Sequence, residues 1–225
     1  MKEFYQHRLP HWQPHGAILF LTYRLYGSLP REAIAQLAAE KRRREKEPPS
    51  SIESPRDRVF REDKELFAIA DAVLDSARGH PQWLARDDIA QIILENLFFH
   101  AEQLHRPWAF VIMPNHVHVL LEPLDQASSP DIEEMHLAAP ARIAHALKSF
   151  TAHRANQVLK RKGAFWEAES YHHWDRDPKE FARTVEYIEN NPVKAGLVNS
   201  PEKWRGSSAA FGRAEDGSCV NQRTR

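Results

Sequence analysis

Residues 108–122 read WAFVIMPNHVHVLLE and carry the clearest strand pattern of the chain. Two runs rich in β-branched, aromatic and leucine residues, 108–113 and 116–122, are separated only by Pro114 and Asn115. So short a separation predicts two antiparallel strands joined by a tight hairpin.

The second of these expected strands carries His116 and His118 two residues apart. Successive side chains alternate between the faces of a strand, so both imidazoles are expected on one face. This geometry suits a divalent metal ion, and a third ligand from elsewhere would leave positions open for a substrate phosphate. The same spacing also occurs in surface and packing histidines. A histidine-triad nucleotide hydrolase is excluded, because Leu120 stands where its third histidine is required.

Segments before the hairpin predict one strand and two helices. Residues 17–25 alternate as a strand, residues 31–39 follow as a helix, and residues 41–58 are expected to be a helix end and a solvated loop. Residues 87–103 predict an amphipathic helix. Its buried side is expected to hold Ile89, Ile92, Ile93, Leu97 and His100.

Segments after the hairpin predict a helix over 140–160, a strand or extended segment over 165–174, and a helix from Asp177-Pro178 to near Asn191-Pro192. The core stripe of the first of these helices is expected to be Ile143, Leu147, Phe150 and Val158. The order strand, helix, hairpin, helix, strand, helix favours an α+β fold in which helices cover an antiparallel sheet.

Composition limits the classes of protein that fit. The 225 residues are enough for one domain, and 42% hydrophobic with 28% charged residues exclude wholesale disorder. Lysine and arginine number 31, as do aspartate and glutamate, so nucleic-acid binding requires local segregation of charge. One cysteine, Cys219, excludes an internal disulfide and a cysteine-based zinc site. No apolar run approaches about 18 residues, which predicts a soluble, cytoplasmic protein without a membrane partner.

Tyr187 and Asn191 lie four residues apart on the last expected helix, so their side chains share one face. A tyrosine can attack phosphorus when a metal polarises the phosphate. The two side chains could therefore point together into the histidine site. Alternatively, Tyr187 packs beside Ile188 and Asn191 caps the helix before Pro192.

Residues 138–166 are locally basic and contain no acidic residue. A basic helix followed by Phe165 and Trp166 could track phosphates and stack a base on Trp166. A solvated basic face is the alternative. The candidate DNA-binding residues are Arg142, Lys148, Arg154, Lys160, Arg161, Lys162 and Trp166.

Two long motifs in this order resemble those of one enzyme family. MPNHVHVLL at 113–121 looks like the HUH signature of the single-tyrosine transposases, and YIENNPVKAGLV at 187–198 looks like their tyrosine helix. RLPHWQP at 8–14, FLTYRL at 20–25 and WRGSS at 204–208 resemble the branch called REP-associated tyrosine transposases. The resemblance covers roughly residues 8–211.

The resemblance implies a ferredoxin-like HUH fold with His116, His118 and Asn191 as ligands of Mg²⁺ or Mn²⁺ and Tyr187 as the nucleophile. It implies cleavage of single-stranded DNA beside a palindromic hairpin, through a 5′-phosphotyrosine intermediate. This branch is expected to act as a monomer, whereas simpler relatives are dimers that exchange tyrosine helices. The alternative is a non-catalytic hairpin-binding or regulatory module on the same fold.

The chain also departs from the family pattern. Tyr171-His172-His173-Trp174 stands where relatives often have an Asp-His pair, and the charged stretch near 40–63 looks like an insertion. We expect one domain over 1–211 and a disordered tail over 212–225.

Overall fold

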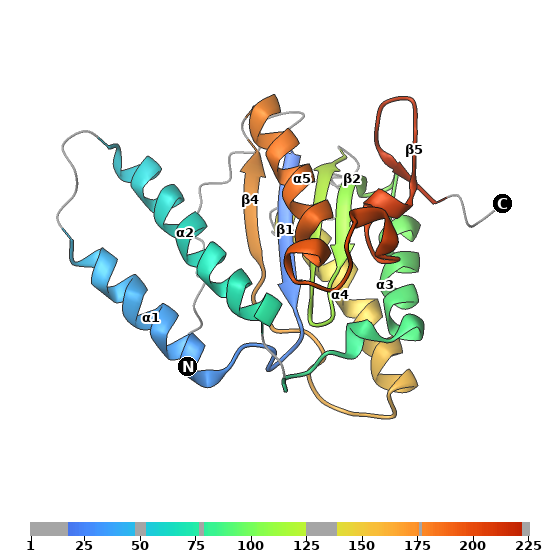
Figure 1. Cartoon of the computed structure of the whole chain (residues 1–225), viewed down its shortest axis with the longest axis horizontal. Coiled ribbons are helices and arrows are strands. Elements are labelled where there is room, and N and C mark those ends of the chain that lie inside the picture. The colour runs from blue at the N-terminus through green and yellow to red at the C-terminus, as the bar shows by residue number, and fades with distance from the viewer. Residues whose placement is uncertain (1–17, 48–52, 77–78, 125–138, 176, 222–225) are drawn as a thin grey trace, which may run out of the picture.

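A four-stranded antiparallel sheet in the order β2-β3-β1-β4 lies at the centre of the computed structural model (Figure 1). The structure describes residues 18–47, 53–76, 79–124, 139–175 and 177–221. The strands are β1 (Ile18–Arg24), β2 (His105–Ile112), β3 (His116–Pro123) and β4 (Tyr171–Asp175). The expected hairpin is confirmed, since β2 and β3 pair antiparallel on either side of Pro114 and Asn115.

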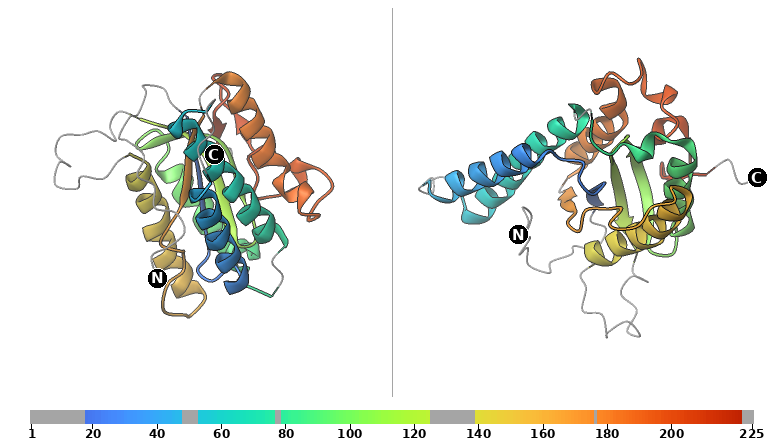
Figure 2. Two further views of the ribbon diagram at one scale, coloured as in Figure 1. Left: turned by 90° about the vertical axis from the view of Figure 1, so that its left-hand side faces the viewer. Right: turned by 90° about the horizontal axis from the view of Figure 1, so that it is seen from below.

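Three helices lie between β1 and the hairpin. One further helix follows the hairpin, and another follows β4. They are α1 (Arg31–Glu45), α2 (Pro55–Ser76), α3 (Asp87–Phe99), α4 (Ala139–Val158) and α5 (Pro178–Lys194). Short 3-10 turns cover Trp83–Ala85, Pro201–Lys203 and Ser208–Ala210. The expected class is confirmed, because helices cover both faces of an antiparallel sheet (Figures 1 and 2). Within the described ranges, no helix has the length and apolar character needed to cross a membrane.

Alternation along the strands divides the core into two layers. Leu19, Leu21 and Val119 face α3 and α4. Phe20 and Leu120 face the opposite way, toward α5 and the end of α2. The second layer forms the floor of the candidate site, because His116 and His118 share the face of Leu120.

The charged stretch after residue 40 is largely helical, which corrects the expected loop. Helix α1 continues to Glu45 and α2 begins at Pro55, although residues 48–52 lie outside the described part of the chain. Ion pairs four residues apart, such as Arg44–Glu40 and Arg58–Glu62, support both helices. Leu66, Ala70 and Leu74 on α2 pack with Leu29 and Leu37. The two helices extend side by side beyond the β4 edge of the sheet (Figures 1 and 2).

Three other expectations are wrong in detail. Phe150 is 55% exposed, and Thr151 occupies the buried position of the α4 stripe instead. Helix α5 passes Pro192 and ends at Lys194, where the Leu197 N–H donates to Pro192 O at 2.9 Å and closes the last turn. Part of the expected disordered tail is ordered.

That ordered part is a small hairpin after the main domain. Strands β5 (Gly212–Arg213) and β6 (Cys219–Val220) pair antiparallel, and Cys219 is buried. Arg213 anchors the hairpin through Glu189 of α5 and the carbonyl oxygen of Trp108. These contacts tie residues 212–221 to the sheet, and residues 222–225 lie outside the described part.

Candidate active site

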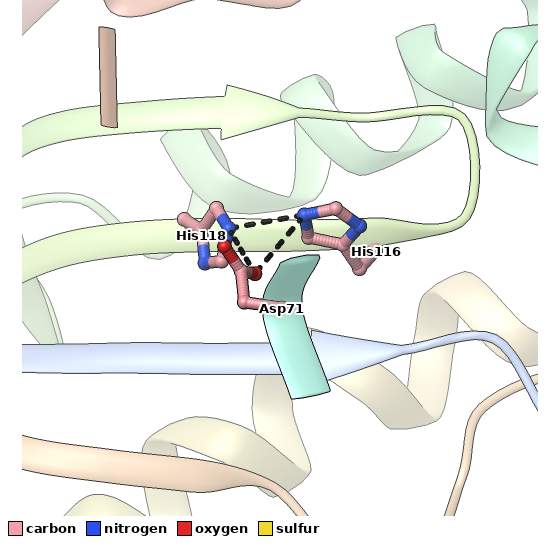
Figure 3. A group of neighbouring side chains, drawn as sticks. All are labelled: Asp71, His116 and His118. Atoms are coloured by element: carbon pink, nitrogen blue, oxygen red, sulfur yellow. Dashed lines mark hydrogen bonds and ion pairs between the residues drawn. The ribbon is translucent and has the colours of Figure 1, made fainter. Parts of the chain in front are cut away.

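Strand β3 brings the two histidines together, as the alternation predicts. His116 and His118 are both fully buried, and their Nε2 atoms lie 3.0 Å apart (Figure 3). Val117 and Val119 point into the other core layer. The hairpin therefore fixes both imidazoles on rigid backbone.

A carboxylate from α2 completes this cluster. Asp71 Oδ1 lies 3.1 Å from His118 Nε2 and 3.7 Å from His116 Nε2 (Figure 3). The Asp71 side chain is 1% exposed. The sequence interpretation missed this residue, although an aspartate on the apolar side of a helix, beside Ala70 and Leu74, was a usable signal.

Hydrogen bonds on the far side of each ring fix its orientation. Asn115 Nδ2 donates to Leu74 O at 2.9 Å, so its Oδ1 faces His116 Nδ1 at 2.7 Å and accepts the proton carried there. His116 Nε2 therefore directs a lone pair at the centre of the cluster. Thr22 Oγ1 lies 2.7 Å from His118 Nδ1 and can donate or accept a hydrogen bond. The Nε2 atom of His118 can therefore carry the ring proton or present a lone pair.

Burial keeps the His116 imidazole uncharged. It lowers the pKa of His116 to about 3, and the neighbouring His118 adds to the effect. Burial also acts to raise the pKa of Asp71, but His118, His116 and the Tyr187 hydroxyl outweigh it and bring the pKa below its usual value. The cluster thus offers a neutral imidazole and an ionised carboxylate at neutral pH.

These donors fit a divalent metal ion. Adjacent ligands at about 2.1 Å from an octahedral ion are roughly 3 Å apart, close to the spacing of the His118, His116 and Asp71 atoms. Asp71 Oδ1 lacks hydrogen-bond geometry with any described residue despite its burial. Buried polar atoms without partners are costly, and a cation would satisfy them. The group Asp71, His116 and His118 could therefore bind a metal.

Helix α5 adds the tyrosine to the same place. Asp177 caps the helix by accepting from the N–H groups of Lys179 and Glu180, which fixes where the turns that follow begin. The Tyr187 hydroxyl donates to Asp71 Oδ2, and its ring centroid is 5.7 Å from that of His118. Burial, and then the charge of Asp71, raises the pKa of Tyr187 well above its usual value. The phenol is therefore protonated and held by Asp71.

Asn191 lies one turn after Tyr187 and is fully buried. Neither its Oδ1 nor its Nδ2 has a hydrogen-bond partner among the described residues. Burial on the Tyr187 side of α5 agrees with the expected geometry, and the ligand role of Asn191 stays a prediction.

Two further charges border the cluster. Asp75, one turn after Asp71, places Oδ1 4.0 Å from His116 Nε2 and Oδ2 3.5 Å from Lys194 Nζ. Burial, together with Asp71, raises the pKa of Asp75 to about 6. Asp75 also lines a pocket of about 360 Å³ with Asn115, Pro114 and Leu197.

The basic residues lie elsewhere. Helix α4 covers the sheet face opposite Tyr187, so the structure does not bring its cations to the cluster. Lys148 Nζ donates to Ala168 O and Ser170 Oγ, and Arg161 stacks 4.0 Å over the Trp83 ring. Arg154, Lys160 and Lys162 are exposed, and Arg142 is half-buried. Their role in binding DNA stays a prediction.

Trp166 is a core residue, which contradicts its expected role in stacking a base. Its side chain packs edge-on against Tyr23 at 4.8 Å, and its Nε1 donates to Thr151 Oγ1 at 2.9 Å. The residue is 6% exposed. Its backbone pairs with Leu25, which draws the ring inward.

Comparisons with known proteins confirm the resemblance. The chain is 29% identical over 108 residues to a putative REP-associated tyrosine transposase of Haemophilus influenzae, covering 44% of this chain and 56% of the relative. It is 32% identical over 94 residues to an uncharacterized protein of the same organism, covering 37% of this chain and 52% of that protein. The chain thus matches just over half the length of these curated relatives. No family model matches.

The fold has a solved counterpart. A structure of a REP-associated tyrosine transposase bound to a REP hairpin matches 91% of this chain and 82% of its own chain, with a TM-score of 0.52 and 15% identity. This match confirms that the chain has the fold of the HUH tyrosine transposases.

Proposed function

We propose that this protein is a metal-dependent DNA transposase that cuts and rejoins single-stranded DNA beside a palindromic hairpin through Tyr187. The observation that carries the proposal is the position of Asp71. One of its oxygens faces the two imidazoles, and the other accepts the hydrogen bond of the Tyr187 hydroxyl. A nucleophile and a metal ligand set that share one carboxylate are placed for attack on a metal-bound phosphate.

In this reaction the Tyr187 oxygen attacks phosphorus, and the 3′ oxygen of the upstream strand leaves as a hydroxyl that takes its proton from solvent. The phosphate is then joined to tyrosine at the 5′ end of the downstream strand, and the phosphodiester energy is kept for rejoining. Asp71 Oδ2 orients the phenol and is the nearest acceptor for its proton. His116, His118 and Asp71 would hold Mg²⁺ or Mn²⁺, with Asn191 as a further ligand. When bound, the ion neutralises phosphate charge and stabilises the leaving oxygen.

The partner proposed is single-stranded DNA with a hairpin. The structural counterpart is bound to a REP hairpin, and the curated relative bears the transposase name. Tyr187 contacts Asp71 and His118 of its own chain, so the site is complete in one molecule, which favours a monomer.

Covalent trapping tests the proposal. A single-stranded hairpin oligonucleotide labelled downstream of the cut, incubated with protein and Mg²⁺ or Mn²⁺, is expected to give an adduct that survives denaturation. The same sequence as a perfect duplex should give almost none, because a stacked duplex does not enter between β3 and α5. An adduct on the upstream 3′ end, or equal reaction of the duplex, would contradict the mechanism. Hairpin binding without any adduct on palindromic substrates would favour the non-catalytic module.

The exposed cations of α4 and the turn after it provide a separate prediction about DNA binding. Reversing Arg154, Lys160 and Lys162 to glutamate is expected to weaken binding and to reduce the log–log salt slope by about 2, at about 0.7 per lost phosphate contact. Hairpin affinity measured across a salt series checks this. Reversal of three exposed cations, Arg31 and Arg42 on α1 and Lys46 at its C-cap, is the matched control. An unchanged slope in the first variant would show that this surface faces away from DNA.

A further inference from the structure

A second buried cluster of ligating side chains lies at the β4 edge of the sheet. His173 and Asp175 come from β4 and Glu180 from the first turn of α5. One ligand atom of each lies within 4.8 Å of the others. The three residues are 7%, 8% and 8% exposed.

This cluster is distinct from the candidate active site. His173 pairs across the sheet with Phe20, and the Phe20 ring stacks on His118 at 5.6 Å. Both clusters therefore lie on the same face of the sheet, with Phe20 between them. Neither His173 nor Asp175 contributes to the reaction proposed for Tyr187.

The contacts converge on an imidazole nitrogen. His173 Nε2 lies 3.0 Å from Glu180 Oε1 and 3.8 Å from Asp175 Oδ1. Thr184 Oγ1 donates to Asp175 Oδ1 at 3.2 Å, and the His173 ring packs 4.6 Å from that of Phe60. Two carboxylates and one imidazole thus face one another in a dry environment.

One atom of this group lacks any partner. The Asp175 side chain is 1% exposed, and its Oδ2 has no hydrogen bond to any residue in the described ranges. Leaving a buried carboxylate oxygen unsatisfied is costly. The geometry indicates that a positive group completes this site.

Among the described residues, Lys64 is one cation that reaches this cluster. Its Nζ lies 3.0 Å from Glu180 Oε1, but its side chain is 55% exposed. This contact is made to Glu180 and leaves Asp175 Oδ2 without a hydrogen bond among the described residues. A divalent ion between the three side chains would balance both carboxylates, and Lys64 is long and exposed enough to turn toward solvent.

We propose that His173, Asp175 and Glu180 form a second metal site, which binds a divalent transition ion, Zn²⁺ or Mn²⁺. Imidazole with carboxylate ligands suits ions of this class, and three protein ligands leave further positions for water. The site joins β4 to the first turn of α5, the helix that carries Tyr187 two turns later. Its function is to hold α5 against the sheet.

Metal stoichiometry of the full chain tests the proposal independently of DNA cleavage. Metal-free protein is titrated with Zn²⁺ or Mn²⁺ in separate arms, by calorimetry and elemental analysis. In a His116→Ala, His118→Ala background, one ion per chain is expected to remain in the arm that fits the site. Adding Asp175→Asn, which keeps the shape of the side chain, and His173→Gln is expected to remove it. Equal stoichiometry and affinity with and without these two changes in both arms would overturn the proposal.

The role of Lys64 gives a sharper comparison. Lys64→Met removes a competing cation and is expected to tighten metal binding roughly fivefold, the scale of an exposed ion pair. Lys160→Met, an exposed lysine on the opposite face, is the matched control and should change nothing. If Lys64→Met leaves metal affinity unchanged and only destabilises the fold, the cluster is an ion-pair network and the proposal is wrong. If the unmodified protein binds two ions but forms no DNA adduct, the transposase mechanism is refuted and the second metal site is not.

Discussion

Tyr187→Phe is expected to abolish formation of the protein–DNA adduct, with a loss on the order of 10⁴-fold or more, while hairpin affinity stays nearly unchanged. The substitution removes the attacking oxygen and no other atom. The fold loses one hydrogen bond, that to the ionised Asp71, which costs about 2 kcal/mol. Denaturing gels of the labelled oligonucleotide, with binding measured in parallel, check both halves of the expectation.

Tyr171→Phe is the matched control for this variant. Tyr171 is a buried tyrosine on the same face of the sheet, with its ring stacked on Phe67 at a centroid distance of 4.0 Å. It is expected to keep adduct formation. Adduct from Tyr187→Phe, with none from Tyr171→Phe, would move the nucleophile to β4.

The parts of the site that could be predicted are those set by neighbours in sequence. Pro114-Asn115 between two apolar runs determines the hairpin, and strand alternation then puts His116 and His118 on one face. The spacing of Tyr187 and Asn191 on a helix is equally local. These features follow from short-range geometry, which one sequence contains.

The parts that could not be predicted depend on long-range packing. Asp71 joins the histidines only because α2 docks beside β3, where Asn115 Nδ2 bonds to Leu74 O. The dense charges before residue 66 hid this helix, since paired charges on a helix resemble those of a solvated loop. Composition likewise showed that residues 138–166 are basic but not that α4 lies across the sheet from Tyr187.

Trp166 illustrates the same limit for a single side chain. An aromatic residue after a basic helix fits a base-stacking platform and a core position equally well by sequence. The backbone bridge to Leu25 and the hydrogen bond to Thr151 decide for the core. Both contacts depend on how α4 and β1 pack, which local sequence does not specify.

Asp71→Asn provides the strictest test of the site, because Asp71 connects its two functions. Asparagine keeps the shape of the side chain and an oxygen that can accept from Tyr187, but it removes the negative charge facing His118. We expect Mn²⁺ affinity at the histidine site to fall at least tenfold and cleavage to fall roughly 10³-fold, since a metal ion supplies several kcal/mol of transition-state stabilisation. His118→Ala is expected to cause a loss of similar size.

Asp75→Asn distinguishes ligation by Asp71 from a general effect of negative charge. Asp75 lies one turn farther along α2, with Oδ1 4.0 Å from His116 Nε2, and removing its charge changes the electrostatic field of the cluster without removing one of the three ligands. We expect it to reduce Mn²⁺ affinity and cleavage by less than about tenfold. Calorimetric titration without DNA and single-turnover cleavage measure the two quantities separately. Equal losses in the two variants would mean that Asp71 acts through charge alone, and the ligand set would then have to be sought around His116, His118 and Asn191.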